Sequence, residues 1–287
     1  MKFHKSIDDQ ITILKRHGLI IQDDLFAKKT LSNINYYRLS GYLYQFKHSD
    51  GRYEPGLTFE RILDLYEFDS KFTRILMYAL ENVEETLKTR FSYALSSSFP
   101  REPLIYLEGK IYRNQNEVKA FTSIFEKSKK ENDALPFIKH YNSKYGGDLP
   151  IWVAVEIMTM GNIHKLYNNL LTTYQKKIAK EYNTGPKQLQ SWIENLTYTR
   201  NHLAHYMRIY DYSFGRIPAS CSNHPAMTQS GMIFDQIMAM GFMFSDGKEW
   251  KLHVVPEISR LVDEYHQSII LSDIGFPPDW KDILKSI

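Results

Sequence analysis

The sequence predicts an all-α protein built around one very long helical stretch. From Leu57 to Ser98 the chain contains neither Gly nor Pro, the two residues that most often interrupt helices. Apolar residues recur every three or four positions from Leu65 to Ala94, and this spacing is typical of a helix with one buried face. We therefore expect a helical bundle whose long axis is a single helix or two nearly collinear helices.

The residues before this stretch predict three short helices. Ser6 is expected to cap the first, which runs through Arg16, and Asp23 or Asp24 to cap the second. A third is expected from Asn35 to Phe46. Turn-forming residues fill the segment 48–56. We therefore predict a small N-terminal helical attachment at residues 1–50 and a main helical domain at residues 57–287.

The second half of the chain predicts further helices separated by turn residues. Leu149-Pro150-Ile151 opens one, with Trp152 among its core residues, and Gly161-Asn162 interrupts or ends it. Gly185-Pro186 sets off the next, and the last two are expected at 230–244 and from 248 or 255 to 271. Methionines in the first of these two favour either a core or a dimer interface, with core the commoner outcome: Met232, Met238, Met240 and Met243.

Composition limits the class of protein. The 287 residues are 43% hydrophobic, which is enough to bury a substantial core, and the single Cys221 excludes a disulfide framework or a Cys-rich zinc site. The start of the chain lacks the apolar run of a signal peptide, and no stretch reaches the ~18 apolar residues of a membrane span. We expect a cytoplasmic protein with no membrane partner. The net charge of +3 is too small to indicate nucleic-acid binding without local clustering.

One stretch, Thr199 to Arg208, carries an unusual set of polar residues. At the helical period, an apolar stripe would be buried on one side of it: Trp192, Leu196, Thr199, Leu203, Met207 and Tyr210. Asn201 and His205 would be i,i+4 neighbours on another side, and His205 and Arg208 i,i+3 neighbours, so that all three can reach one ligand. This combination of cations, amide and imidazole is suited to holding a phosphate.

The relation between Arg200 and His205 is less direct. Five residues apart on a helix, they lie about 140° apart around its axis. Their headgroups converge only if the arginine side chain bends back, or if a second subunit completes the pair. We also considered metal binding by His202 and His205, but no His-Glu-x-x-His or carboxylate motif accompanies them. We therefore expect no metal and no cofactor.

A second cluster, in the N-terminal attachment, interleaves aromatic rings with a cation. Its members are Tyr36, Tyr37, Arg38, Tyr42 and Tyr44. Such a pattern can stack bases and hold phosphate, although half-buried packing is the more common fate of tyrosines. From the two clusters we expect Tyr37, Arg38, His202 and Arg208 to contact the bases or phosphates of a nucleic acid, which the family resemblance described next identifies as RNA.

These motifs resemble a known family. The Arg-x4-His element Arg200–His205, late in an all-helical chain, looks like the signature of the HEPN superfamily of ribonucleases. The wider context is similar to the Abi-like family, which includes the AbiD and AbiF abortive-infection proteins. That likeness rests, in order, on the segments 34–42, 59–69, 149–152 with Gly161-Asn162, and 275–280. It implies a HEPN-like bundle, a homodimer and a role in anti-phage defence or toxicity.

The resemblance also implies metal-independent cleavage of RNA by attack of the ribose 2′-hydroxyl. His205 would act as general base or acid, because histidine exchanges protons near neutral pH. Arg200 would stabilise charge on the phosphoryl oxygens, and Asn201 would position a phosphate oxygen or the imidazole. The alternative is a non-catalytic helical protein that binds RNA, in complex with a structured non-coding RNA.

Three positions bear on the resemblance. Glu84 is either solvated charge or a group that reaches the site and orients Arg200 or His205. Lys88 stands where the family would have an arginine, and the two are not interchangeable at a bidentate site. Family-like toxins controlled by modification of a tyrosine two residues after the histidine would need Tyr at position 207, and Met207 argues against that control.

Overall fold

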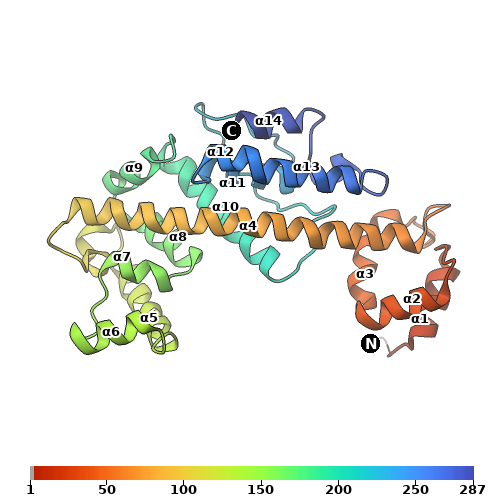
Figure 1. Cartoon of the computed structure of the whole chain (residues 1–287), viewed down its shortest axis with the longest axis horizontal. Helices are drawn as coiled ribbons and strands as arrows, with labels where there is room; N and C mark the ends of the chain where they lie inside the picture. Colours follow the sequence, from red (N-terminus) through yellow and green to blue (C-terminus); the bar gives the residue numbers. More distant parts are fainter. Residues whose placement is uncertain (1–2) are drawn as a thin grey trace.

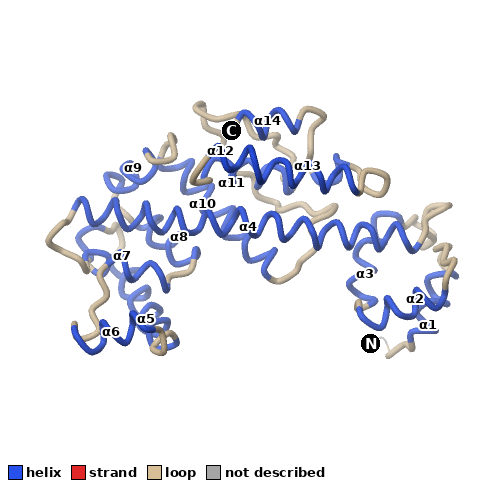
Figure 2. Tube along the Cα trace, viewed as in Figure 1, coloured by secondary structure: helices blue, strands red, loops and turns tan. Residues whose placement is uncertain are grey.

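The computed structural model describes residues 3–287, and in this range the chain is helical with no β-strand (Figure 2). This confirms the all-α prediction. The long helix α4 (Phe59–Ser98) forms the axis of the molecule (Figure 1). The C-terminal helices and α9 (Thr172–Lys180) lie along one flank of α4, whereas the N-terminal helices and the helices between residues 115 and 169 lie at its two ends on the other flank (Figure 1).

The N-terminal helices begin where their capping residues predict. Ser6 and Asp9 form a reciprocal capping box at the start of α1 (Ile7–Arg16). The Asp23 carboxylate accepts hydrogen bonds from the first backbone N–H groups of α2 (Asp24–Asn33). Asn35 caps α3 (Tyr36–Leu43), which continues as a 3-10 turn, Tyr44–Phe46. All three predicted helices are therefore confirmed.

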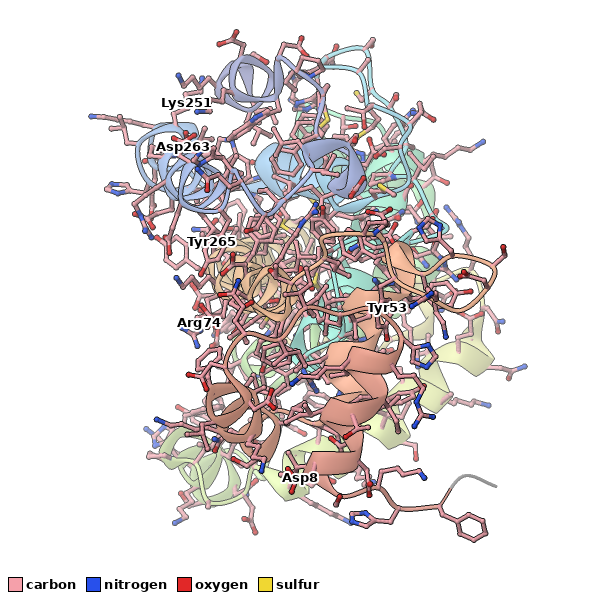
Figure 3. The ribbon with its side chains drawn as sticks, turned by 90° about the vertical axis from the view of Figure 1, so that its right-hand side faces the viewer. Asp8, Tyr53, Arg74, Lys251, Asp263 and Tyr265 are labelled. Atoms are coloured by element: carbon pink, nitrogen blue, oxygen red, sulfur yellow. The ribbon has the colours of Figure 1, made fainter. Side chains whose placement is uncertain are left out.

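Helix α4 is one continuous helix of 40 residues, about 60 Å long at 1.5 Å per residue. Thr58 caps its first turn. The predicted apolar stripe from Leu65 to Ala94 is buried along its length, so α4 contributes to the core over its whole span. Viewed along this axis, charged side chains such as Arg74, Lys251 and Asp263 point outward from several elements (Figure 3).

The middle of the chain forms short helices at one end of α4. They are α5 (Gln115–Glu131), α6 (Pro136–Lys144), α7 (Ile151–Ala154), α8 (Met160–Asn169) and α9 (Thr172–Lys180). Two expectations are corrected here. The Trp152 side chain is 52% exposed rather than in the core. Gly161 and Asn162 do not interrupt a helix, because Thr159 and Asn162 form the capping box that starts α8.

Helix α10 (Pro186–Ala204) begins at Pro186, as Gly185-Pro186 predicts. It packs against α4, α8, α9 and α11, and crosses α4 (Figure 1). Its buried residues include Trp192, Leu196, Thr199 and Leu203, in agreement with the predicted stripe. The helix ends at Ala204, however, and therefore does not include His205 or Arg208.

The C-terminal helices complete the core above α4. They are α11 (Ile233–Met243), α12 (Gly247–Glu249), a π-helical turn (Trp250–Val254), α13 (Val255–Glu264) and α14 (Trp280–Ser286). The last helix expected to reach position 271 ends at Glu264, and Leu271–Ile274 is a separate 3-10 turn. Met238, Met240 and Met243 are fully buried, which fits the core interpretation. No helix among residues 3–287 combines the length and the apolar composition that crossing a membrane requires.

Candidate functional site

The end of α10 is a tight reversal of the chain. Its C-cap is His205, after which Tyr206 adopts a left-handed backbone conformation with φ +54°. The Tyr206 N–H donates to the carbonyl of Leu203 and the Met207 N–H to that of His202. This is a Schellman motif, in which the left-handed position is usually glycine. Because this position is a tyrosine and not a glycine, the sequence carries no signal that the helix ends here.

This reversal corrects the predicted geometry of the site. Because Met207 lies beyond the helix, its side chain is 54% exposed instead of forming part of the buried stripe. His205 and Arg208 are not helical neighbours, so the i,i+3 argument for a common ligand does not apply to them. Asn201 remains on the last turn of α10, and its side chain is exposed, as is that of His205.

Arg200 faces α4, where it meets an acidic residue. Its Nε lies 3.7 Å from Oε2 of Glu84, and the Nζ of Lys88 lies 3.0 Å from Oε1 of the same carboxylate. The Glu84 side chain is 17% exposed, whereas that of Arg200 is 40% exposed. Glu84 therefore contacts Arg200. This agrees with the interpretation of Glu84 as a group that orients Arg200, and not with that of a solvated charge. The terminal nitrogens of the guanidinium form no hydrogen bond with residues 3–287 and can face a ligand.

Asn201 and His205 both have exposed side chains. Neither side chain forms a hydrogen bond within the described part of the chain, and none joins His205 to Arg200 or to Glu84. The arrangement thus places an exposed cation, an amide and an imidazole within six residues at one helix end. It does not, within one chain, bring Arg200 and His205 into contact.

His202 has a different environment from the one expected for RNA binding. It is 7% exposed, and its ring centroid lies 4.3 Å from that of Tyr212 and 5.3 Å from that of Phe214. Its Nε2 lies 2.8 Å from the carbonyl oxygen of Arg208, so this nitrogen must carry the donated proton. Burial lowers the pKa of His202. These contacts leave the ring little surface for RNA and indicate that it holds the reversed chain against α10.

Arg208 also contacts protein rather than open solvent. Its Nη1 donates to the carbonyl of Gly41 at 2.8 Å and its Nη2 to that of Asp211 at 3.2 Å. The side chain is 25% exposed. Arg208 therefore ties the segment after α10 to α3, and only its exposed part remains for the RNA contact predicted for it.

Tyr37 and Arg38 lie beside this segment, although they are far from it in sequence. Arg38 donates from Nη1 to the carbonyl of Tyr206 at 3.0 Å, and the Tyr37 side chain is 85% exposed. Both residues line a cavity of about 470 Å³ together with Tyr206, Met207 and Arg208. The fold thus brings the two predicted RNA-binding clusters together at the end of α10.

A family comparison agrees with the sequence motifs. Residues 29–211 match the model of the Abi-like protein family, which is more than half of the chain. The chain belongs to the Abi-like protein family. The matched segment starts within α2 and ends just after Arg208, so it includes Arg38, Glu84, Arg200 and His205. Neither the curated proteins nor the solved structures include a match to this chain. Membership of the HEPN superfamily stays a prediction.

In this Abi-like protein, Asp69 is the residue near the site that sequence inspection missed. Its carboxylate accepts hydrogen bonds from the Tyr42 hydroxyl at 2.8 Å and from the backbone N–H groups of Ile209 at 2.8 Å and Tyr210 at 2.9 Å. Burial raises its pKa to about 6. The sequence feature that could have identified Asp69 is its position four residues after Leu65, which places an acidic residue on the buried face of the predicted helix. Asp69 thereby fixes the segment that follows the helix end.

The polar groups at the end of α10 are not those of a typical metal site. Among residues 3–287, no group of three or more His, Cys, Asp or Glu side chains is arranged to hold one. The polar groups near the end of α10 are instead an arginine, an amide and an imidazole, with Glu84 engaged by Arg200 and Lys88. Such a set can bind a phosphate and transfer a proton without a metal.

Proposed function

We propose that this Abi-like protein is a metal-independent endoribonuclease with a role in abortive infection. The observation that carries the proposal is the end of α10, where Arg200, Asn201 and His205 present polar atoms that no other residue of the described chain occupies. Glu84 supports it by holding Arg200 at its Nε, which leaves the terminal nitrogens for a phosphate. The family membership supports the biological role.

The proposed reaction needs three roles. The 2′-hydroxyl of the ribose attacks the adjacent phosphorus, a new O2′–P bond forms, and the P–O5′ bond breaks. His205 takes the proton from the 2′-hydroxyl or supplies one to the departing 5′-oxygen. Arg200 stabilises the charge that develops on the phosphoryl oxygens, and Asn201 positions the phosphate or the imidazole. The products are a 2′,3′-cyclic phosphate end and a 5′-hydroxyl end.

The geometry within one chain favours a dimeric enzyme. The reaction needs both a base and an acid, yet His202 is buried and His205 is the exposed histidine at this helix end. Arg200 is directed toward Glu84 and forms no hydrogen bond with His205 within residues 3–287. A homodimer that places two helix ends in one cleft would supply two imidazoles and two guanidinium groups. We therefore include a homodimer in the proposal.

The test is to incubate purified protein with labelled single-stranded RNA in EDTA. We expect cleavage, 2′,3′-cyclic phosphate ends, and no activity on DNA, which lacks the nucleophile. Products with 3′-hydroxyl ends, or strict dependence on magnesium, would contradict the mechanism. An intact, shifted RNA band would favour the alternative, a non-catalytic protein that binds a structured non-coding RNA.

Matched variants separate catalysis from folding. His205→Ala and Arg200→Ala should abolish cleavage and keep the melting temperature within a few degrees, since exposed polar residues contribute little to stability. His253→Ala, which changes another exposed histidine, and Arg260→Ala, which changes an exposed arginine on α13, are the controls and should cleave normally. Unfolding of His205→Ala would mean that the histidine is structural.

A further inference from the structure

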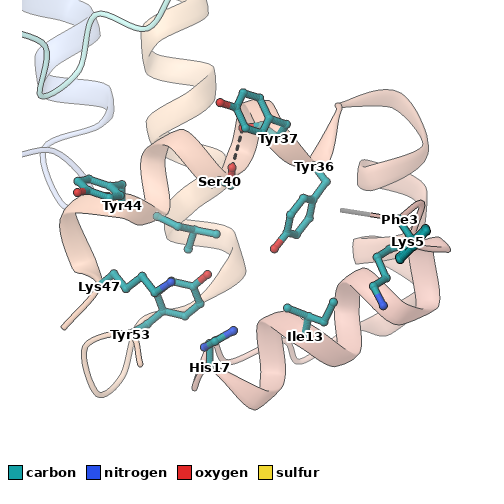
Figure 4. Close-up of a pocket in the computed structure, with 11 residues that line it drawn as sticks. Phe3, Lys5, Ile13, His17, Tyr36, Tyr37, Ser40, Tyr44, Lys47 and Tyr53 are labelled. Atoms are coloured by element: carbon teal, nitrogen blue, oxygen red, sulfur yellow. Dashed lines mark hydrogen bonds between the residues drawn. The ribbon is translucent and has the colours of Figure 1, made fainter. Parts of the chain in front are cut away.

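The N-terminal helices enclose a cavity that the proposed reaction does not use. It has a volume of about 600 Å³, within the range of ligand-binding pockets. Its aromatic rings and lysines come from α3, from the turn and loop that follow α3, and from the segments on either side of α1 (Figure 4). The side chains that matter here are Lys5, Tyr36, Tyr37, Tyr44, Lys47 and Tyr53. We call this cavity the tyrosine pocket.

The tyrosine pocket is electrically suited to an anion. None of its eleven lining residues is acidic, and neither Lys5 nor Lys47 forms an ion pair within residues 3–287. Residues 1–58 contain nine Lys and Arg against six Asp and Glu, whereas the rest of the chain contains 27 of each. The entire excess of positive charge therefore lies in the part of the chain that forms this pocket.

The aromatic rings of the tyrosine pocket include both buried and exposed ones. Tyr53 is 9% exposed and lies next to Lys47 across an isolated β-bridge, with the His17 ring edge-on at 5.9 Å. Tyr37 and Tyr44, in contrast, are 85% and 77% exposed. Buried rings can form the wall of a pocket, but exposed ones gain nothing from packing. Flat rings exposed beside a cation are the feature that single-stranded nucleic acid uses for base stacking.

The tyrosine pocket shares a lining residue with the cavity at the end of α10. Tyr37 lines both this pocket and the neighbouring cavity that contains Tyr206, Met207 and Arg208. Arg38 and Tyr206 in turn line a smaller cavity with Arg74 of α4. Tyr206 exposes 74% of its side chain. Aromatic and cationic residues therefore follow one another from the pocket to the residue next to His205.

We propose that the tyrosine pocket binds an unpaired base of single-stranded RNA, with Lys5 and Lys47 on the neighbouring phosphates. The inference rests on the proposed function and names its substrate class, because the strand would continue over Tyr37 and Tyr206 toward Arg200 and His205. A duplex is not a suitable ligand, since its bases are stacked on each other and cannot enter a pocket.

The test measures binding separately from cleavage. The probe is a short fluorescein-labelled 2′-O-methyl RNA, which lacks a free 2′-hydroxyl and cannot be cut by the proposed reaction. Fluorescence anisotropy with the full-length protein gives its Kd. Tyr44→Ala and Tyr37→Ala should each weaken binding about five- to a hundredfold, the usual effect of losing one base–aromatic stack. Lys5→Ala and Lys47→Ala should each reduce the slope of log K against log salt by about 0.7.

Two matched controls are available. Tyr93 on α4 is 73% exposed, and Lys251 is an exposed lysine of the C-terminal part. Tyr93→Ala and Lys251→Ala should leave both the Kd and its salt dependence unchanged. A second readout uses a probe that contains 4-thiouridine, which should crosslink under ultraviolet light to residues of the tyrosine pocket.

Each outcome decides one proposal. If the Tyr44 and Lys47 variants bind like wild type, if crosslinks map elsewhere, or if duplex RNA binds better, the pocket does not bind a single strand. A pocket that takes a peptide would also give unaltered RNA binding in these variants. If the pocket variants lose binding but wild type cleaves no RNA, the pocket proposal stands and the nuclease proposal fails. If the wild type cleaves RNA and the pocket variants cleave it equally well, the nuclease proposal stands and the pocket proposal fails.

Discussion

The Asp69 carboxylate offers a direct test of how the end of α10 is held. It lies on the buried face of α4 and accepts hydrogen bonds from the Tyr42 hydroxyl of α3 and from the backbone N–H groups of Ile209 and Tyr210. One side chain therefore joins α3, α4 and the segment after the helix end. Replacing it should loosen all three at once.

The expected loss follows from these contacts. Asp69→Ala leaves two buried N–H groups without an acceptor, at about 1–3 kcal/mol each. Tyr42 and Asp69 both line a cavity of about 130 Å³, where water can replace the lost partner of the Tyr42 hydroxyl. We therefore expect the free energy of unfolding to fall by about 2–6 kcal/mol. Asp69→Asn keeps one oxygen acceptor but turns an amide N–H₂ toward a donor, so its loss should be smaller.

The same residue predicts a dependence on pH. Burial raises the pKa of Asp69 in the folded protein to about 6, from an ordinary value of 3.8. The folded state thus binds the Asp69 proton more tightly than the unfolded state does. Proton binding by Asp69 therefore adds to the free energy of unfolding. This contribution is fully present below about pH 4 and is lost as the pH rises through about 6. The stability difference between wild type and Asp69→Asn should therefore shrink over that window.

Urea denaturation, followed by circular dichroism, measures both effects. Wild type, Asp69→Ala and Asp69→Asn are compared at about pH 4.5 and about pH 7.5, with Asp133→Ala as the control because Asp133 is exposed and forms no side-chain hydrogen bond with the described residues. A loss below about 1 kcal/mol for Asp69→Ala would show that the three hydrogen bonds do not hold the segment. A difference that grows with pH would mean that the hydrogen bonds outweigh burial.

Three further perturbations test the core and the proposed site. Leu203→Ala truncates a fully buried side chain of α10 and should lower the unfolding free energy by about 2–5 kcal/mol in the same assay; an unchanged urea midpoint would contradict its place in the core. Glu84→Gln removes the charge that orients Arg200, so the cleavage rate should fall by up to about a hundredfold, and a normal rate would make this ion pair dispensable. Mixing Arg200→Ala with His205→Ala should restore part of the activity through heterodimers, whereas a fully active monomer would exclude a shared cleft.

The positions of most helices follow from local chemistry. Ser6, Asp23 and Gly185-Pro186 mark helix starts because caps and the proline ring act within one turn. The long helix α4 follows from the absence of Gly and Pro and from an unbroken apolar stripe. Trp152 shows where such reasoning ends, because an aromatic residue next to apolar neighbours looks buried, and only the packing of other helices decides whether it is covered.

The candidate site was predictable in residue content but not in geometry. The apolar spacing continues through Met207 and Tyr210, so the pattern favours a helix beyond its real end. Tyr210 is buried for another reason: Asp69 binds its backbone after the chain has reversed. Likewise, His202 and His205 differ only in their surroundings, and the rings that bury His202 come from the returning chain at Tyr212 and Phe214.

The left-handed Tyr206 explains why the N-terminal helices belong to this site. A non-glycine residue in this conformation costs of order 1 kcal/mol, which the hydrogen bonds around the turn must offset. Arg38 adds a hydrogen bond to the Tyr206 carbonyl, and Arg208 adds one to that of Gly41. The predicted division between an N-terminal attachment at residues 1–50 and the main domain stays a prediction, and these contacts join its two sides. A fragment of residues 57–287 would lack Arg38, Gly41 and Tyr42, the α3 residues that bind Tyr206, Arg208 and Asp69. The strained turn beside His205 therefore depends on α3 for its shape.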